Sequence, residues 1–187
     1  MSLATKPSKG TAVITGASTG IGAIYASRLA HMGYDLIIIA RNHHRLNQMA
    51  SRITADTARN VEVLAVDLAD AQQLSVLEQK LRDDASITLL VNNAGITRDR
   101  MFLKMTPEDW AQVIDTNLNS MFNVTKQVVS DMVEKGWGRI INISSVNGEK
   151  GQAGQTNYSA AKAGMHGFTM ALAQELATKG VTVNTVA

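Results

Sequence analysis

The chain has 187 residues, of which 45% are hydrophobic and 18% charged, and its net charge is +2. This balance is typical of one globular domain, and it excludes a disordered chain and a basic nucleic-acid-binding tail. The absence of cysteine excludes disulfides, and the four histidines lack the spacing of metal ligands, so no metal is expected. No apolar run is long enough to cross a membrane, and residues 1–9 lack the apolar segment of a secretion signal, which predicts a cytoplasmic protein.

The first expected strand, residues 11–15, runs directly into a glycine-rich turn. A helix follows over residues 21–32, with Ile24 among the apolar residues on its inner side. In this context glycines let the backbone approach a pyrophosphate, and the helix N-terminus supplies unpaired N–H groups and the positive end of a dipole. We therefore predict a dinucleotide site, whose contacts in this turn are Gly16, Ser18, Thr19, Gly20, Ile21 and Gly22.

The second expected strand, residues 35–40, is followed by Arg41 and has no acidic residue at its end. An acid at this place holds the ribose 2′-hydroxyl of NAD, whereas an arginine suits the 2′-phosphate of NADP. A charge-assisted bond of about 1.5–3 kcal/mol favours NADP by roughly ten- to a hundred-fold, so NADP(H) is the expected cofactor. The alternative is that Arg41 is a solvated charge at a helix start, and His43 and His44 are interpreted as surface residues.

The third and fourth expected strands, residues 61–66 and 87–91, are each followed by polar residues. Asp67 lies on the cofactor side, where it is expected to accept a hydrogen bond from the adenine amino group. The paired asparagines Asn92 and Asn93 can tie strand ends together, and the glycine beyond them allows a tight turn over a ligand. The expected cofactor contacts from these two strand ends are Asp67, Leu68, Asn93, Ala94, Gly95 and Ile96.

Thr106, Pro107 and the two acids after them are the start signal of a helix, which is expected to continue unbroken to about residue 134. Asn117 lies within this helix, where an asparagine is mildly unfavourable. It is interpreted either as a surface hydrogen-bonding residue or as a water-binding link to the active site. The inner face of the helix is expected to include Val113, Ile114, Leu118, Phe122 and Val129.

Ser145 follows an apolar strand, residues 140–143, and Tyr158 and Lys162 stand four residues apart in the next helix. That spacing puts the last two side chains on one helical face, one turn apart. A phenol with a pKa of about 10 is a poor proton donor at neutral pH, but an ammonium group ~4 Å away in a partly buried site lowers that pKa toward 7. Ser145 could then hold a carbonyl oxygen while Tyr158 protonates it. Taken alone, the pair is more typical of an exposed helix, where the tyrosine packs and the lysine is solvated.

Six expected strands alternate with helices, and the last strand covers residues 181–186. This alternation predicts an α/β fold: a Rossmann-type, doubly wound parallel sheet with helices on both faces, in one domain over residues 1–187. The first glycine turn is expected at the switch point of the sheet. Residues 148–156 are expected to form a loop, and the helices are expected over residues 21–32, 44–54, 71–81, 107–134 and 158–178.

These motifs resemble the short-chain dehydrogenase/reductase family. The glycine turn after Thr15, the asparagine pair with its glycine, and the later polar residues occur in the family's order and spacing over essentially the whole chain. The resemblance implies that Tyr158 passes a proton to the substrate oxygen, Ser145 positions that oxygen, and Lys162 lowers the tyrosine pKa and holds the nicotinamide ribose. It also implies that Asn117 holds a water molecule in a proton relay. The implied catalytic residues are Asn117, Ser145, Tyr158 and Lys162, and Tyr158 and Lys162 also contact the cofactor.

Residues 96–101, 115–118 and 145–164 resemble one branch more closely, the acetoacetyl-CoA reductases, followed by the 3-oxoacyl-acyl-carrier-protein reductases. This implies NADPH-dependent reduction of a 3-oxoacyl thioester to the 3-hydroxyacyl thioester by a homo-oligomer, with neither nucleic acid nor membrane as partner. The alternatives are a carrier-protein substrate or another ketone, a non-catalytic NADP-binding module, and a fragment that needs a partner chain. The implied substrate contacts are Asp99, Ser145, Gln152, Gln155 and Tyr158.

The sequence departs from the resemblance at two places. The part before residue 96 looks more like another branch of the family, which suggests that two lineages join there. Family members also continue beyond the last strand with a segment over the nicotinamide, a substrate lid and a seventh strand. These parts are expected to be absent here, because the sequence stops at Ala187.

Overall fold

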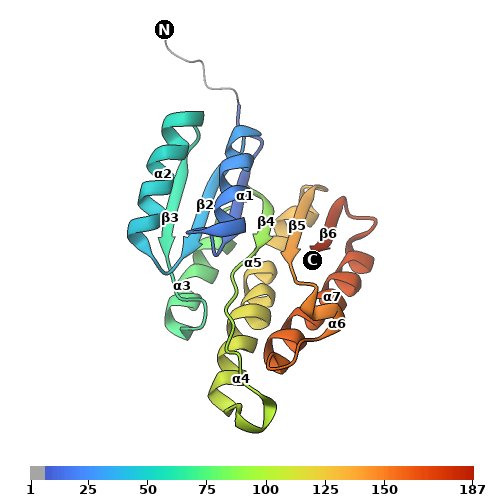
Figure 1. The fold of residues 1–187 in the computed structure, drawn as a ribbon. Helices are drawn as coiled ribbons and strands as arrows, with labels where there is room; N and C mark the ends of the chain where they lie inside the picture. Colours follow the sequence, from blue (N-terminus) through green and yellow to red (C-terminus); the bar gives the residue numbers. More distant parts are fainter. Residues whose placement is uncertain (1–6) are drawn as a thin grey trace.

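The computed structural model describes residues 7–187 and contains one sheet of parallel strands (Figure 1). The strand order is β3-β2-β1-β4-β5-β6, so the chain steps outward in one direction from β1 and in the other from β4. The glycine turn after β1 therefore lies at the switch point, and the predicted doubly wound α/β fold is confirmed. The strands are β1 (Thr11–Thr15), β2 (Asp35–Ala40), β3 (Val61–Ala65), β4 (Ile87–Asn92), β5 (Gly138–Ile143) and β6 (Val181–Val186).

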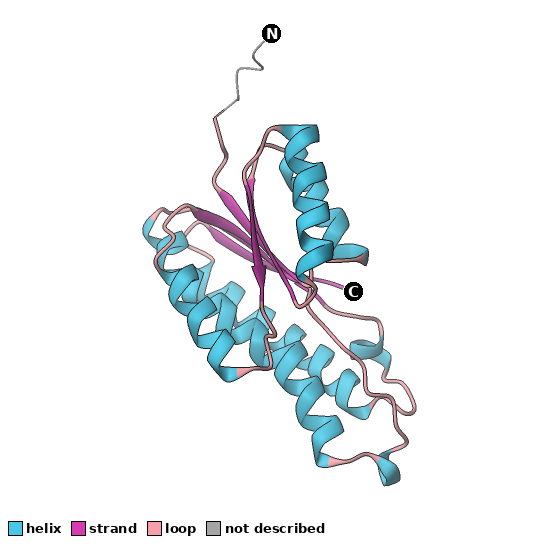
Figure 2. Ribbon diagram, turned by 90° about the vertical axis from the view of Figure 1, so that its left-hand side faces the viewer, coloured by secondary structure: helices cyan, strands magenta, loops and turns pink. Residues whose placement is uncertain are grey.

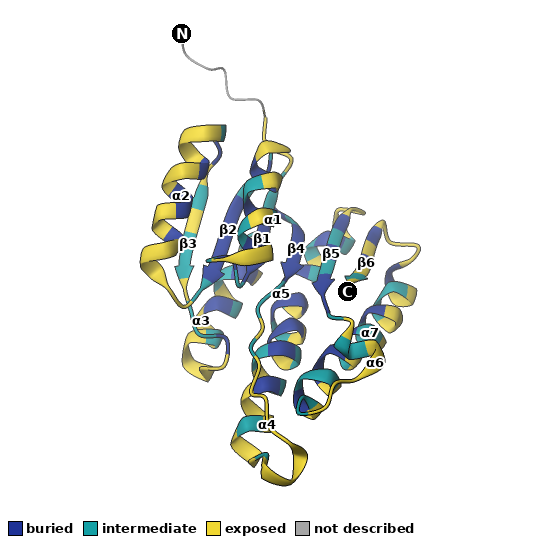
Figure 3. Ribbon diagram, in the orientation of Figure 1, coloured by how far each residue is buried: buried dark blue, intermediate teal, exposed yellow. Residues whose placement is uncertain are grey.

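Helices cover both faces of the sheet, which stands between two helical layers in Figure 2. Successive side chains of a strand point to opposite faces, so Ile14 packs in the core beneath α1 and α2 while its neighbour Val13 packs in the core beneath α3, α5 and α7. The central strands β1, β2 and β4 accordingly belong to the most deeply buried part of the molecule, whereas the edge strands β3 and β6 are partly exposed (Figure 3). The longer helices are α1 (Gly20–His31), α2 (His43–Thr57), α3 (Ala71–Arg82), α4 (Pro107–Ile114), α5 (Ser120–Glu134) and α7 (Thr156–Leu176).

The helix predicted over residues 107–134 is interrupted by a π-helical turn, Asp115–Asn119, between α4 and α5. Its start is as expected, because Thr106 and Asp109 form a reciprocal capping box. A π turn contains more residues than an α turn, so it rotates the faces of the helix that follows. For this reason Phe122 is 53% exposed, and its predicted place on the inner face is wrong.

Two other expectations from the sequence are corrected by the structure. Ile24 is 54% exposed because it lies about 200° around α1 from the buried Gly22 and Ala26. The predicted loop over residues 148–156 begins with a short helix, α6 (Asn147–Lys150), and a single 3-10 turn, Phe102–Lys104, precedes α4. The remaining helix ends differ from prediction by a few residues, which is the usual uncertainty of helix ends.

No helix in the part of the chain that the structure describes combines the length and the apolar character needed to cross a membrane. The expectation about a secretion signal concerns mainly residues 1–6, which lie outside the described residues.

Candidate active site

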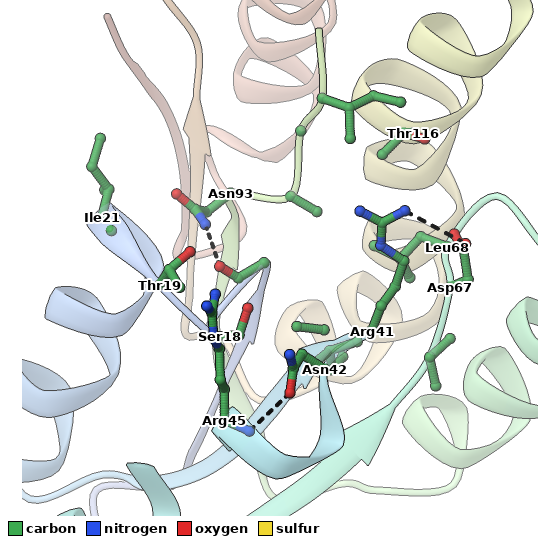
Figure 4. Close-up of a pocket in the computed structure, with 18 residues that line it drawn as sticks. Ser18, Thr19, Ile21, Arg41, Asn42, Arg45, Asp67, Leu68, Asn93 and Thr116 are labelled. Atoms are coloured by element: carbon green, nitrogen blue, oxygen red, sulfur yellow. Dashed lines mark hydrogen bonds and ion pairs between the residues drawn. The ribbon is translucent and has the colours of Figure 1, made fainter. Parts of the chain in front are cut away.

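A cavity of about 900 Å³ lies at the carboxyl ends of the central strands, where a doubly wound sheet binds its ligand (Figure 4). Most of the cofactor contacts predicted from the sequence line it, and Gly22, Tyr158 and Lys162 do not. The sequence analysis did not anticipate Asn42, Arg45 and Thr116. The complete lining is Gly16, Ser18, Thr19, Gly20, Ile21, Ile39, Ala40, Arg41, Asn42, Arg45, Val66, Asp67, Leu68, Asn93, Ala94, Gly95, Ile96 and Thr116.

The glycine turn and the segment after β4 are joined into one unit by Asn93. Its Nδ2 donates to the carbonyl oxygens of Thr15 and Gly16 at 3.0 and 3.1 Å. Gly16 has φ = +65°, and a Cβ there would lie 2.8 Å from Asn93 Nδ2, so only glycine fits. A Cβ on Gly22 would lie 2.5 Å from the same Nδ2. Gly22 does not line the cavity, so its role is to let the glycine turn pack closely against Asn93.

The N-terminus of α1 faces this cavity without a side-chain cap. Thr19 is its N-cap residue, but its side chain makes no capping hydrogen bond. The start of α2, by contrast, is capped by Asn42, whose Oδ1 accepts from the backbone N–H of Arg45 at 3.0 Å. The first backbone N–H groups of a helix have no intrahelical partner, so α1 offers them to an anion in the cavity.

At the end of the cavity formed by β2 and β3, Arg41 leans toward Asp67 (Figure 4). Its Nη1 lies 3.9 Å from Asp67 Oδ2, and the two side chains are 67% and 40% exposed. The end of β2 has no acid of its own, as the sequence indicated, but the end of β3 supplies one. Asp67 also accepts from the backbone N–H of Ala69 at 3.0 Å, which holds its carboxylate at the strand end.

Lys162 is almost fully buried, with 3% of its surface exposed. Its Nζ donates to the carbonyl oxygen of Ile143 at 2.6 Å and lies 5.7 Å from the centre of the Tyr158 ring. Burial lowers the pKa of the Lys162 ammonium from 10.5 to about 8, because the charged form loses its hydration. The interpretation of this pair as an exposed one with a solvated lysine is therefore wrong.

Asn117 is fully buried in the π turn, so its interpretation as a surface residue is also wrong. Its Oδ1 accepts from Ile96 N at 2.8 Å and its Nδ2 donates to Ile96 O at 2.9 Å, which fixes the segment after β4. A Cβ added to Gly95 would lie 3.5 Å from Asn117 Oδ1 and 3.7 Å from Lys162 Nζ. Because Gly95 lines the cavity, the cavity reaches the place where the buried asparagine and lysine converge.

Ser145 begins a chain of hydrogen bonds that leads through Asn147 and Gln155 to Asp99. The backbone N–H of Asn147 donates to Ser145 Oγ at 3.2 Å, which leaves the serine hydroxyl proton available to another acceptor. Asn147 Nδ2 donates to Gln155 Oε1 at 2.9 Å, and Gln155 Nε2 donates to Asp99 Oδ2 at 2.9 Å. Asp99 and Gln155 are thus brought together, while Gln152 lies exposed in the same loop.

A second polar network ties the strand ends beneath the site. Asn92 Nδ2 donates to Thr125 Oγ1 and Asn142 Oδ1 at 3.0 and 2.9 Å, so the predicted role of Asn92 in joining strand ends is confirmed. Asn142 Nδ2 donates in turn to Thr169 Oγ1 at 2.9 Å, which also bonds to Thr185. The network connects β4, β5 and β6 with α5 and α7, and so fixes the helix that carries Tyr158 and Lys162 to the sheet.

Comparison with known proteins gives consistent matches over almost all of the chain. The family model "short chain dehydrogenase" matches residues 10–187. An acetoacetyl-CoA reductase from Cupriavidus necator is 51% identical over 179 residues, which are 94% of this chain and 72% of that protein. A 3-oxoacyl-acyl-carrier-protein reductase from Vibrio harveyi is 42% identical over 94% of this chain and 71% of its own length. Because one relative matches both sides of residue 96, the reason for inferring two joined lineages disappears.

Solved structures give the same result. A bulky-bulky ketone specific alcohol dehydrogenase from Comamonas testosteroni superposes with a TM-score of 0.92 at 35% identity, covering 96% of this chain and 72% of that one. A short-chain dehydrogenase from Sphingobium yanoikuyae in complex with NADPH superposes with a TM-score of 0.91 at 37% identity, covering 94% and 69%.

Proposed function

Because the chain belongs to the short chain dehydrogenase family, we propose that it is an NADPH-dependent reductase of 3-oxoacyl thioesters of the acetoacetyl-CoA type. The observation that carries this proposal is the convergence of Gly95, Asn117 and Lys162 where the cavity meets α7. The glycine turn alone would support only the binding of a dinucleotide, whereas a buried lysine beside a tyrosine supports proton transfer. The acetoacetyl-CoA reductase relative supports the substrate class.

The residues that line the cavity fit NADP(H). The uncapped start of α1 suits the pyrophosphate, and the close approach permitted by Gly16 suits its neighbouring ribose. Arg41 suits the 2′-phosphate, and the NADPH complex of the related Sphingobium enzyme supports the same choice. When bound, NADPH supplies the hydride.

In the proposed reaction, Tyr158 gives its phenolic proton to the substrate carbonyl oxygen. Ser145 holds that oxygen, since its own proton is not used by the Asn147 N–H bond. A protonated Lys162 stabilises the negative charge left on Tyr158 by Coulomb attraction, and its bond to the Ile143 carbonyl holds its Nζ 5.7 Å from the centre of the ring. General acid catalysis of this kind contributes about 10²–10⁴-fold to a rate.

We assign Asn117 to the return of the proton from solvent through a bound water. Both ends of its side-chain amide are occupied by Ile96, so its side chain fixes the segment after β4. We therefore assign the water contact to the backbone of the π turn, a kind of turn that is frequent at functional sites.

The acyl thioester is proposed to enter beside Asp99, Gln152 and Gln155. The chain of hydrogen bonds from Asp99 to Ser145 makes this opening polar and ordered. A carrier-protein thioester is the second candidate, which the Vibrio relative supports, and a simple ketone is the third, which the Comamonas structure supports.

We also propose that the chain acts as one domain in a cytoplasmic homo-oligomer. A groove of about 540 Å³ between α5 and α7 combines apolar side chains with both signs of charge. A second copy related by a two-fold axis could place Lys126 and Lys179 against Glu134 and Glu175. Sedimentation velocity at several concentrations tests this, and a concentration-independent monomer contradicts it.

The proposed function is tested by NADPH oxidation with acetoacetyl-CoA, an acetoacetyl carrier protein and a small ketone, each beside NADPH binding measured by fluorescence. Preferred turnover of acetoacetyl-CoA supports the proposal. Preferred turnover of another substrate replaces the substrate class. NADPH binding without turnover of any of the three means a non-catalytic binding module.

A further inference from the structure

The side chain of Asn147 lies in the middle of a hydrogen-bonded chain. Its Nδ2 donates to Gln155 Oε1 at 2.9 Å, and Gln155 Nε2 donates to Asp99 Oδ2, also at 2.9 Å. The backbone N–H of Asn147 donates to Ser145 Oγ at 3.2 Å. Asn147 therefore connects the serine of the proposed reaction with two of the side chains proposed to lie beside the entering thioester.

This chain of side chains has a defined direction, because its members differ in what they can donate. An ionised carboxylate only accepts hydrogen bonds, whereas a side-chain amide has a donor end and an acceptor end. Asp99 therefore selects the NH₂ end of Gln155, which turns the carbonyl end of that amide toward Asn147. A donor is then required at position 147, and the amide of Asn147 supplies one.

The side-chain amide of Gln155 bonds across two segments that are far apart in the sequence. Asp99 lies in the segment after β4, and Gln155 is the N-cap residue of α7. The backbone N–H of Arg100 donates to the Gly154 carbonyl oxygen at 2.8 Å, so the two segments already lie side by side. The direction of the Gln155 amide decides whether their side chains are joined as well, and so where the Asp99 carboxylate lies.

We propose that Asn147 is a positioning residue for the thioester substrate. It acts through Gln155: by donating to the carbonyl end of that amide, it keeps the NH₂ end on Asp99 and fixes both side chains beside the entering thioester. This inference rests on the proposed function. Aspartate has nearly the same shape as asparagine but lacks the donor, so the role requires the amide.

The test compares variants that differ in shape and in hydrogen-bonding capacity. Steady-state NADPH oxidation gives kcat and the KM for acetoacetyl-CoA, fluorescence gives the Kd for NADPH, and thermal unfolding checks that the fold is kept. The variants are Asn147→Asp, Asn147→Ala, Asp99→Asn and the double variant Asn147→Asp/Asp99→Asn. Asn123→Asp is the matched control, since it makes the same change on α5 at a position that does not line the cavity.

Asn147→Asp is expected to raise the KM for acetoacetyl-CoA by about ten-fold, with kcat changed less than about three-fold and the Kd for NADPH less than about two-fold. The reason is that Gln155 then lies between two carboxylates, and its Nε2 can be held by only one of them in a single geometry. Asn147→Ala should raise the KM less, because it removes the donor without adding a second carboxylate. Asn123→Asp should have the wild-type KM.

The double variant can close the chain in the opposite direction. The carboxylate at position 147 then accepts from Gln155 Nε2, and the amide at position 99 donates to Gln155 Oε1. Asp99→Asn should therefore lower the KM in the Asn147→Asp background, although it leaves the KM unchanged or raises it in the wild-type background. A purely structural role of Asn147 would not produce this change of sign.

The inference is overturned if Asn147→Asp has the wild-type KM, if Asn147→Ala is impaired more than Asn147→Asp, or if Asp99→Asn fails to lower the KM in the Asn147→Asp background. An equal increase from Asn123→Asp also overturns it, because added negative charge alone would then explain the weaker substrate binding. A wild type that does not reduce acetoacetyl-CoA refutes the proposed function, and the inference falls with it.

Discussion

The two ends of the cavity differ in how far their functional side chains are buried and in how tightly those side chains are bonded. At the end formed by β2 and β3, where we propose that the adenosine part of the cofactor binds, the side chains of Arg41 and Asp67 are 67% and 40% exposed and lie 3.9 Å apart. At the catalytic end, Asn117 and Lys162 are buried and bonded to backbone carbonyl or N–H groups at 2.6–2.9 Å. An exposed ion pair contributes about 0–1 kcal/mol, whereas removing one partner of a buried hydrogen bond costs about 1–3 kcal/mol. Substitutions should therefore tune cofactor choice at the first end and abolish function or alter stability at the second.

The largest expected effect is at Tyr158. Tyr158→Phe removes the proton donor but keeps the ring, so the reduction rate should fall by about 10²–10⁴-fold while NADPH still binds. Tyr25→Phe on α1 is the control and should keep the wild-type rate. The reduction rates of the two variants are compared by steady-state NADPH oxidation. Wild-type turnover by Tyr158→Phe would show that another group is the acid.

The second prediction concerns the rigid segment after β4. Asn117→Ala leaves the N–H and carbonyl groups of Ile96 without their partners, which should lower the free energy of unfolding by about 2–3 kcal/mol. Asn119→Ala, at an exposed position of the same π turn, should change it by less than about 0.5 kcal/mol. Urea unfolding compares the two, and equal effects would contradict the difference drawn between buried and exposed positions.

Lys162→Met should raise the free energy of unfolding while it abolishes the reduction of the substrate. The folded pKa of about 8 lies below the ordinary 10.5, so burying the charged form costs about 3 kcal/mol below pH 8. Methionine avoids this cost but loses the bond to Ile143 O, worth about 1 kcal/mol. The variant should thus be about 2 kcal/mol more stable near pH 7 and inactive in reduction.

The same substitution has a defined pH dependence. Between pH 8 and 10.5 the unfolded chain holds a proton that the folded chain has released, so wild-type stability rises with pH in that window. The advantage of Lys162→Met should therefore shrink toward about pH 10, whereas exposed Lys150→Met should show no such trend. A variant that is less stable at every pH would mean that the buried ammonium is compensated elsewhere.

The smallest effect is expected at Asp67. Asp67→Asn releases Arg41, so NADPH should bind up to about five-fold tighter with NADH little changed. If Asp67 instead accepts from the adenine amino group, as the sequence suggested, both cofactors should bind more weakly. Fluorescence titration with both cofactors separates these outcomes.

Local motifs allowed much of the fold to be predicted. The glycine turn, the Thr106 cap and the alternation of strands and helices depend on neighbours in the sequence, and each is found where it was expected. The proximity of Arg41 and Asp67 depends instead on strand register: Ala40 pairs with Ala65, which brings the residues after the two strands together. No local pattern specifies that register.

At the catalytic end of the cavity, too, the contacts depend on features that local sequence patterns did not predict. Asn117 attracted attention because asparagine is unfavourable within a helix, but its bonds to Ile96 depend on a π turn that the apolar spacing did not reveal. Arg45 was missed because an arginine in a first helical turn gives no signal until the cavity shows which side it faces.

The most direct test of the central claim is product analysis after incubation of the purified chain with acetoacetyl-CoA and NADPH that carries deuterium at both hydrogen positions of the nicotinamide C4. We predict 3-hydroxybutyryl-CoA carrying one deuterium from the wild type, with little or none from Tyr158→Phe. A wild-type chain that binds NADPH yet yields no deuterated hydroxyacyl thioester would contradict the account.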